Sequence, residues 1–188
     1  MQAKKGFLKA KALYESDKLD DALEVINNAI HKDPENLNLY HLRGRIFFDL
    51  SKYKLAMQDF ELILTHFPND INVLLDIASI HYKMNEYNLA IEIYNMILKV
   101  QKNHLDANYN KALVLNEMKR YHDALKSISK TFNMYPLEHQ VVKLKAVILY
   151  NIGNFKESLE CFDRVLYFEP DDETCKYYKT ILESILKE

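Results

Sequence analysis

Glycine and proline are scarce in this sequence, with three and four residues respectively among 188. Proteins rich in β-turns and long loops need more of both, because these residues supply most tight turns. The scarcity therefore predicts a largely helical protein. The three glycines, Gly6, Gly44 and Gly153, also lie far apart in the chain. Their dispersal excludes a glycine-rich loop that would cradle a phosphate.

Cysteine and long apolar runs are lacking as well. The two cysteines, Cys161 and Cys175, fit neither a metal-binding motif nor a disulfide framework. No run approaches the roughly 20 apolar residues that cross a bilayer, and the N-terminus has no signal-peptide core. No Asn-x-Ser/Thr acceptor for glycosylation occurs. We therefore expect a cytoplasmic protein without membrane insertion, in which both cysteines are buried, unreactive thiols.

Neither sign of charge dominates. The chain has 25 Lys and Arg residues against 27 Asp and Glu residues, and a net charge of -2 gives no general attraction to nucleic acid. The seven histidines include no pair four residues apart on one helix, as a zinc site would need. Nucleotide-binding, metalloprotease and serine-hydrolase motifs are absent from the sequence. We expect a non-enzymatic protein with no cofactor, no metal site and no nucleic-acid partner.

What the sequence does contain is a period of 34 residues. Three registers recur at this spacing: prolines (Pro34, Pro68, Pro136 and Pro170, with Lys102 in the remaining place), small residues (Ala22, Ala56, Ala90, Ala124 and Ser158) and large apolar residues (Leu19, Tyr53, Tyr87, Tyr121 and Phe155). A fixed period of this length indicates a stacked repeat array.

Each period predicts two helices. In Leu37–Asp70, apolar and small residues recur at helical spacing on both sides of Lys52, which forms the turn. Pro68 ends the second helix, because proline has no N–H and disfavours helix in the residue before it. Polar residues occupy the expected N-cap positions of following helices: Asn36, Asp70 and Asp172.

With these registers the sequence resembles the tetratricopeptide repeat family over essentially the whole chain. The resemblance implies an all-α fold, a right-handed α-solenoid of stacked antiparallel helix pairs with a C-terminal capping helix. It also implies one domain, 1–188, with repeats at about 3–36, 37–70, 71–104, 105–138 and 139–172 and the capping helix at 173–188.

Several positions carry specific expectations within this fold. Small residues on the first helices (Ala10, Gly44, Ala78, Ala112 and Ala146) and the Ala56 register on the second helices let each helix pair approach closely. Thr131 stands where a small apolar residue is usual. Gly6 stands where a large anchoring residue is usual, so we expect either that the first helix frays, which we favour, or that the chain is cut from a longer array. The capping helix would cover the last repeat with four residues: Tyr177, Thr180, Ile181 and Ile185.

The resemblance further implies a concave groove, lined by the first helix of each repeat, that binds a peptide or helix of a partner protein. The repeat register gives its lining: Lys11, Tyr14, His41, Arg45, Phe48, Asp49, Asn72, Asp76, Ser79, Tyr82, Tyr109, Asn110, Asn116, Lys143 and Tyr150. One register in this set is aromatic: Tyr14, Phe48, Tyr82 and Tyr150, with Asn116 as the exception. These rings form either a ladder for a bound peptide or ordinary helix-packing contacts. The charges, basic near Arg45 and acidic near Asp76, either select the register of a peptide or belong to a solvated face.

The second helices point to an alternative function. Their outward positions, which the family usually gives to charged residues, hold Leu55, Leu62, Leu89 and Met96, with Ile93 between the last two. These side chains form an apolar association patch, or they are partly buried beneath their neighbours. If they form an association patch, the protein would be a self-assembling scaffold and a homo-oligomer. The leading hypothesis remains a module that binds a protein or peptide partner in the groove.

Overall fold

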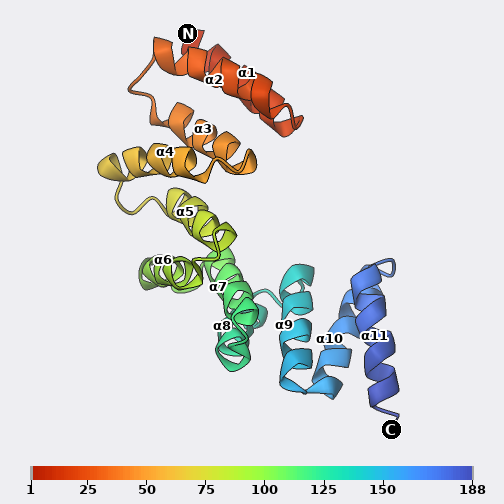
Figure 1. Cartoon of the computed structure of the whole chain (residues 1–188). Helices are drawn as coiled ribbons and strands as arrows, with labels where there is room; N and C mark the ends of the chain where they lie inside the picture. Colours follow the sequence, from red (N-terminus) through yellow and green to blue (C-terminus); the bar gives the residue numbers. More distant parts are fainter. Residues whose placement is uncertain (1, 188) are drawn as a thin grey trace. The chain divides into compact units, whose positions relative to one another are not determined.

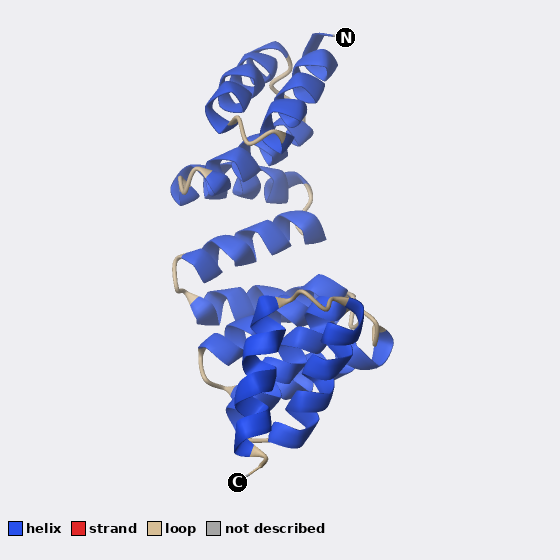
Figure 2. Ribbon diagram, turned by 90° about the vertical axis from the view of Figure 1, so that its right-hand side faces the viewer, coloured by secondary structure: helices blue, strands red, loops and turns tan. Residues whose placement is uncertain are grey.

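The computed structural model describes residues 2–187, with side chains from Lys4 onward. Over these residues it contains eleven helices and no strand (Figures 1 and 2). The helices are α1 (Gln2–Glu15), α2 (Leu19–Lys32), α3 (Leu37–Asp49), α4 (Tyr53–His66), α5 (Ile71–Lys83), α6 (Tyr87–Val100), α7 (Leu105–Glu117), α8 (Tyr121–Met134), α9 (His139–Ile152), α10 (Phe155–Phe168) and α11 (Glu173–Ile185). The predicted all-α helical-repeat solenoid is confirmed. Within residues 2–187, no helix has the length and apolar character of a membrane span.

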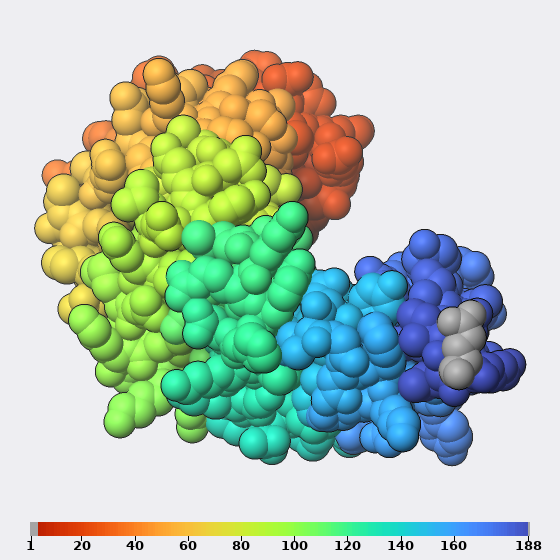
Figure 3. Space-filling view, turned by 60° about the horizontal axis from the view of Figure 1, so that its bottom comes forward, coloured from red at the N-terminus to blue at the C-terminus, as the bar shows by residue number. Residues whose placement is uncertain are grey.

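The chain divides into two compact units, Met1–Glu86 and Tyr87–Glu188. The first contains α1 to α5 and the second contains α6 to α11. In each unit, consecutive helices pack side by side, and side chains fill the space between them (Figure 3). The boundary falls between the two helices of the third expected repeat, and the single domain expected from the sequence stays a prediction.

Small residues allow the close helix packing that the sequence predicted. All ten positions of the two small-residue series, from Ala10 and Ala22 onward, are buried. A Cβ atom on Gly44 would lie 2.6 Å from the ring of Phe60, so this ring packs directly on the backbone of α3. Gly6 plays the same part, because a Cβ there would lie 2.9 Å from Cβ of Ala29. The expected fraying of the first helix is wrong: α1 is helical from Gln2, and Gly6 is a point of close approach to α2.

Each first helix ends in the same left-handed turn. One residue in each of these turns has a positive φ angle: Asp17, Ser51, Asn85, Lys119 and Gly153. After α3, the N–H of Lys52 donates to the carbonyl of Phe47 and the N–H of Ser51 to that of Phe48, both at 2.8 Å. This pair of bonds is the Schellman motif, which satisfies carbonyls at the end of a helix. The turn therefore forms in four repeats without glycine.

Two of the three predicted N-caps form as expected. The Asp70 side chain accepts bonds from the N–H groups of Asn72 and Val73, and Asp172 accepts one from Cys175. Asn36 occupies the N-cap position of α3 but makes no side-chain cap bond. Its Nδ2 donates to Asp33 instead, at 3.0 Å. A side chain that satisfies the first turn stabilises a helix by about 1 kcal/mol.

The covering face of α11 differs from the predicted one. Tyr178 stacks on Phe162 with ring centres 5.0 Å apart, and Leu182 is fully buried. Of the four predicted residues, Tyr177 is 64% exposed, Thr180 and Ile185 are exposed as well, and Ile181 is half-buried. The predicted face is wrong because Tyr178 and Leu182 each lie one residue after a predicted position, which is a rotation of about 100° on a helix.

Both cysteines belong to this last part of the core. Cys161 on α10 and Cys175 on α11 are buried free thiols, as the sequence predicted. Burial is the main cause that raises the pKa of both, in the case of Cys175 to about 12. Since the thiolate is the reactive form, these two cysteines are unreactive at neutral pH.

Candidate peptide-binding site

Three first helices of the first unit meet around a small cavity. The cavity has a volume of about 130 Å³ and is lined from α1, α3 and α5, with Phe60 of α4 beside them. Six of the predicted groove residues line it: Tyr14, Arg45, Phe48, Asp49, Asp76 and Ser79. The fold therefore brings residues from three repeats into one place.

Tyr14 links α1 to α3. Its Oη donates a hydrogen bond of 2.6 Å to Oδ2 of Asp49. The guanidinium carbon of Arg45 lies 5.5 Å from the centre of the Tyr14 ring, within cation–π distance. Burial, reinforced by the bond to Asp49, raises the pKa of Tyr14 to about 12. Tyr14 therefore remains a neutral donor at physiological pH and holds Asp49 in place.

A second link of the same kind joins α3 to α5. His41 Nε2 lies 2.7 Å from Oδ2 of Asp76, and the His41 ring meets Phe60 edge-on with centroids 5.8 Å apart. Both links join positions 35 residues apart. Each carboxylate of the site is thus engaged by a neighbouring first helix. Arg45 is exposed and, within the described residues, has no carboxylate at ion-pair distance.

Two members of the aromatic register, Phe48 and Tyr150, contact rings on neighbouring helices. The ring of Phe48 lies 5.7 Å from that of Tyr53, at the start of the following helix. The ring of Tyr150 lies 5.8 Å from that of Phe155 and 5.2 Å from that of Tyr178. These contacts give the register a packing role. The rings are only half-buried, so a peptide ladder on their free faces stays a prediction.

Five predicted groove residues belong to the second unit. Lys143 donates to Oδ2 of Asp172 at 2.5 Å, and this bond is the main cause that lowers the pKa of Asp172. Lys143 therefore binds the N-cap of α11 rather than standing as a free groove charge. Asn116 accepts a bond of 3.0 Å from Asn151. The others are half-buried: Tyr109, Asn110 and Tyr150, with the pKa of Tyr109 raised mainly by burial.

Four predicted groove residues of the first unit do not line the cavity, and one of them is His41, which is bonded to the lining residue Asp76. Lys11 is exposed and makes a loose ion pair with Glu15 at 3.7 Å. Asn72 is exposed at the start of α5, and Tyr82 is half-buried near its end. The structure thus gathers six predicted residues in one unit and leaves the others spread over both.

The outward positions of the second helices are open to solvent. On α4, Leu55 and Leu62 are 41% and 36% exposed, and on α6, Leu89 and Met96 are 44% and 49% exposed. Ile93 is half-buried between the latter two. The helices α4 and α6 therefore each present a pair of exposed apolar side chains at the predicted outward positions.

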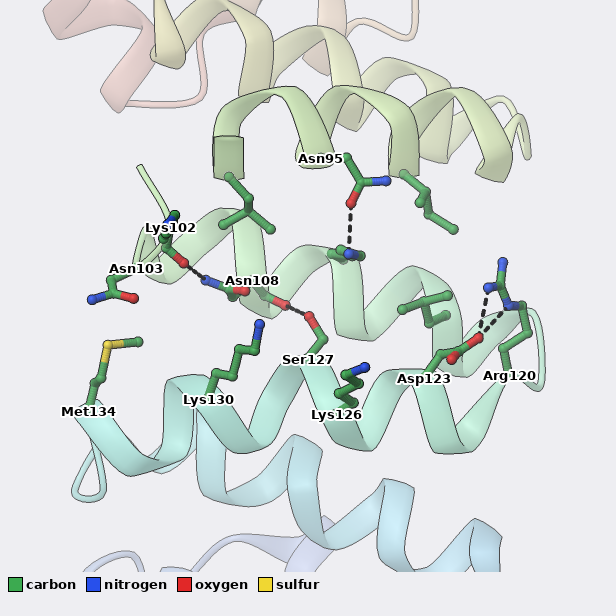
Figure 4. Close-up of a pocket in the computed structure, with 14 residues that line it drawn as sticks. Asn95, Lys102, Asn103, Asn108, Arg120, Asp123, Lys126, Ser127, Lys130 and Met134 are labelled. Carbon is green, nitrogen blue, oxygen red and sulfur yellow. Dashed lines mark hydrogen bonds and ion pairs between the residues drawn. The ribbon is translucent and has the colours of Figure 1, made fainter. Parts of the chain in front are cut away.

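A second cavity escaped the sequence analysis. It lies in the second unit among α6, α7 and α8, has a volume of about 650 Å³, and is lined by none of the predicted groove residues (Figure 4). Among the described residues, no three His, Cys, Asp or Glu side chains gather as a metal site. The sequence did contain a signal for this cavity: Ser127 stands two periods after Asp59, so a charged residue is replaced by an uncharged one at the same position of the repeat.

Comparisons with known families identify repeats along most of the chain. Two models described as tetratricopeptide repeat match residues 7–71 and 144–172. The model for anaphase-promoting complex, cyclosome, subunit 3 matches residues 59–131. No curated protein matches the chain by sequence.

Solved structures share the fold at low sequence identity. A tetratricopeptide repeat protein from Parabacteroides merdae is 21% identical over 99% of this chain and 74% of its own, with a TM-score of 0.81. YrrB, a tetratricopeptide repeat protein with an unusual peptide-binding site, is 18% identical over 93% of this chain and 90% of its own, with a TM-score of 0.70. TTC0263, a thermophilic tetratricopeptide repeat protein from Thermus thermophilus, is 14% identical over 96% of this chain and 98% of its own, with a TM-score of 0.72.

Proposed function

Because the chain belongs to the tetratricopeptide repeat family, we propose that it is a non-enzymatic module that binds a peptide or helix of a partner protein through its first helices. The family generally serves protein interaction rather than catalysis. The neighbour YrrB has a peptide-binding site, which supports the same class of function here.

The observation that carries this proposal is the cavity among α1, α3 and α5. Six of its lining residues are those that the repeat register assigns to the groove. At about 130 Å³ the cavity has room for one apolar side chain, with Phe48 and Phe60 as its apolar wall. Arg45 at its rim is suited to a carboxylate or a carbonyl of the same peptide. The bonds of Tyr14 to Asp49 and of His41 to Asp76 fix the rim before binding, which lowers the entropy cost of association.

A peptide library presented to the whole protein tests the proposal. Selected peptides should contain an apolar residue next to an acidic or polar one. Their dissociation constant should rise at least tenfold in Arg45→Glu, because the reversal repels the ligand and loses about 1.4 kcal/mol or more. Lys83→Glu, an exposed change near the end of α5, is the matched control and should leave binding unchanged. Selected peptides that bind both variants equally would remove the cavity as the site.

The exposed apolar pairs favour a second candidate, a self-assembling scaffold. Leu62 and Met96 are each more than a third exposed on second helices. Light scattering of the unmodified protein over a concentration series tests this function. An oligomer that becomes a monomer in the double variant Leu62→Glu, Met96→Glu would support it. A strict monomer at every concentration would exclude it.

A further inference from the structure

The cavity among α6, α7 and α8 is strongly cationic. Five basic side chains line its volume of about 650 Å³: Lys102, Lys111, Arg120, Lys126 and Lys130. The single acidic residue in the lining, Asp123, is held by Arg120 at 2.7 Å. Figure 4 shows Lys102 at one end, Arg120 at the other, and Lys130 extending from α8 toward α7. Like charges repel when they gather, so this arrangement favours an anion.

The first unit shows how the fold neutralises a cation at the equivalent position. Arg43 on α3 lies between Asn27 of α2 and Asp59 of α4. It donates to Asn27 Oδ1 at 3.1 Å and to both oxygens of Asp59 at 2.8 and 2.6 Å. The Asp59 residue is only 4% exposed, and its bonds are the main cause that raises the pKa of Arg43. A buried carboxylate is thus the internal counter-ion.

The second unit repeats this arrangement without the carboxylate. Two periods later, the same three positions hold Asn95, Lys111 and Ser127. Lys111 Nζ donates to Asn95 Oδ1 at 2.7 Å, as Arg43 donates to Asn27, with the same separation of 16 residues. Ser127 is buried and its hydroxyl donates to the carbonyl of Asn108. The place that the Asp59 carboxylate fills therefore carries no negative charge.

Other half-buried cations in this register have a carboxylate from elsewhere. Lys145 pairs with Glu157 at 2.9 Å, and Lys179 pairs with Asp163 at 2.6 Å. Within the described residues, Lys111 has no carboxylate at ion-pair distance. Burial, followed by the charge of Lys130, lowers the pKa of Lys111, with Asp123 acting in the opposite sense. The cost of leaving this cation partly desolvated falls when an external anion arrives.

We propose that this cavity binds a carboxylate side chain of an acidic peptide, in the place that the Asp59 carboxylate takes beside Arg43. The floor is aliphatic, with Ile91, Leu98 and Leu115, and suits an apolar side chain next to the acidic one. The lining runs along α8 from Arg120 to Met134, about 20 Å, which is the span of a short peptide.

The chemistry of the lining favours a peptide over a nucleic acid or a phosphorylated small molecule. No aromatic side chain is among the residues that line the cavity, so bases would find no ring on which to stack. The aliphatic part of the lining, Ile91, Leu98 and Leu115, suits an apolar side chain of a peptide and offers nothing to a phosphate group. The surface also lies on a different face of α7 from the predicted groove residues, because Asn108 is offset from Tyr109, and Lys111 from Asn110, by about 100°. This site is therefore separate from the proposed groove.

One substitution tests the proposal by supplying the missing counter-ion. The probe is a fluorescein-labelled peptide of alternating Glu and Leu, about eight residues long, which spans the cavity when extended. Ser127→Asp should raise its dissociation constant at least tenfold, since the new carboxylate occupies the site. Ser127→Asn, of the same size and uncharged, should keep it within about threefold. Equal binding by the two variants, or no binding of the peptide to the unmodified protein, would overturn the proposal.

A second pair of variants tests the outer lysines without touching the buried position. Lys126→Glu with Lys130→Glu should weaken the peptide at least tenfold, and should not harm folding because it relieves repulsion. Lys9→Glu with Lys156→Glu changes the net charge equally at exposed positions and should leave binding unchanged. The same peptide with Gln in place of Glu should not bind. Stronger binding of inorganic polyphosphate or of a single-stranded oligonucleotide than of the peptide would contradict an acidic-peptide site.

Discussion

At the scale of single residues, Lys119 holds a backbone conformation that L-amino acids rarely adopt. Its φ angle is 59°, in the left-handed region, and its side chain is exposed. Lys119→Gly should raise the free energy of unfolding by about 0.5–1 kcal/mol, because glycine adopts this conformation without a steric cost. Urea denaturation measures the change. Gly153→Ala is the converse control and should lower stability by about 1 kcal/mol, since a Cβ there meets no atom within 4 Å and only the backbone is strained. Changes of the same sign in both variants would refute this account.

Thr131 carries a buried hydroxyl without a partner. Its residue is fully buried, and among the described residues Oγ1 makes no hydrogen bond. The equivalent positions in the other repeats are apolar: Ala29, Ile63, Ile97 and Val165. Thr131→Val, which keeps the shape, should therefore raise the free energy of unfolding by about 1 kcal/mol. Ser158→Ala is the contrasting variant, because the Ser158 hydroxyl donates to Ala146 at 2.8 Å, and it should lower stability in the same assay.

The 34-residue period predicted many of the buried positions, because a position with room only for a small side chain holds Ala, Gly or Ser in every repeat. The Ala10 and Ala22 series are buried as expected. The left-handed series was missed, although Asp17, Asn85 and Gly153 in one register are residues that favour this conformation. The relation of Lys111 to Ser127 was missed for another reason. It appears only when two registers on neighbouring helices are compared together: the pair Arg43 and Asp59 becomes Lys111 and Ser127 two periods later.

At the scale of helices, α11 shows what periodicity leaves open. The sequence predicted the helix but placed its covering face one residue away, because both Tyr177 and Tyr178 continue an apolar stripe. The Tyr178 face is buried because it stacks on Phe162 of α10, a contact that no periodicity specifies. An apolar pattern of helical period thus predicts that a helix forms more reliably than it predicts which face of that helix packs against a neighbouring helix.

The start of α11 depends on Asp172. Its carboxylate accepts from the N–H of Cys175 at 2.8 Å and from Lys143 at 2.5 Å. Asp172→Ala should lower the free energy of unfolding by about 1–2 kcal/mol at pH 7. The neighbouring Asp171→Ala should change it little, because Asp171 is fully exposed and has only a 3.7 Å ion pair. Thermal denaturation of both variants measures the difference.

The same residue predicts a dependence on pH. The pKa of Asp172 is lowered in the folded protein, chiefly by Lys143. Its contribution is therefore complete above the unfolded pKa of about 3.9 and is lost as the pH falls through the lower folded value. The stability difference between the unmodified protein and Asp172→Ala should shrink below about pH 4. A difference that stays constant down to pH 2 would mean that Asp172 acts without its charge.

At the scale of the whole molecule, the period treats five repeats alike, whereas the structure divides the chain after Glu86. A period records which residues recur, and it does not record how closely neighbouring helices pack. The candidate groove was predictable in part for the same reason. The register named six residues that meet around one cavity in the first unit. It could not show that Lys143, at a similar position, is bound to the cap of α11.

The division also predicts that the second unit folds alone. Two clusters of its buried core are formed by residues of α7 to α11, and all residues of the cationic cavity belong to this unit. Fragment 87–188 should therefore show helical circular dichroism, unfold cooperatively on heating, and bind the Glu and Leu peptide within about threefold of the full chain. Fragment 105–188 keeps all the fully buried residues of the two clusters but lacks α6, which supplies Ile91 and Asn95 to the cavity. This fragment should fold but should no longer bind the peptide. An unfolded fragment 87–188 would mean that residues 1–86 are needed for the stability of the second unit.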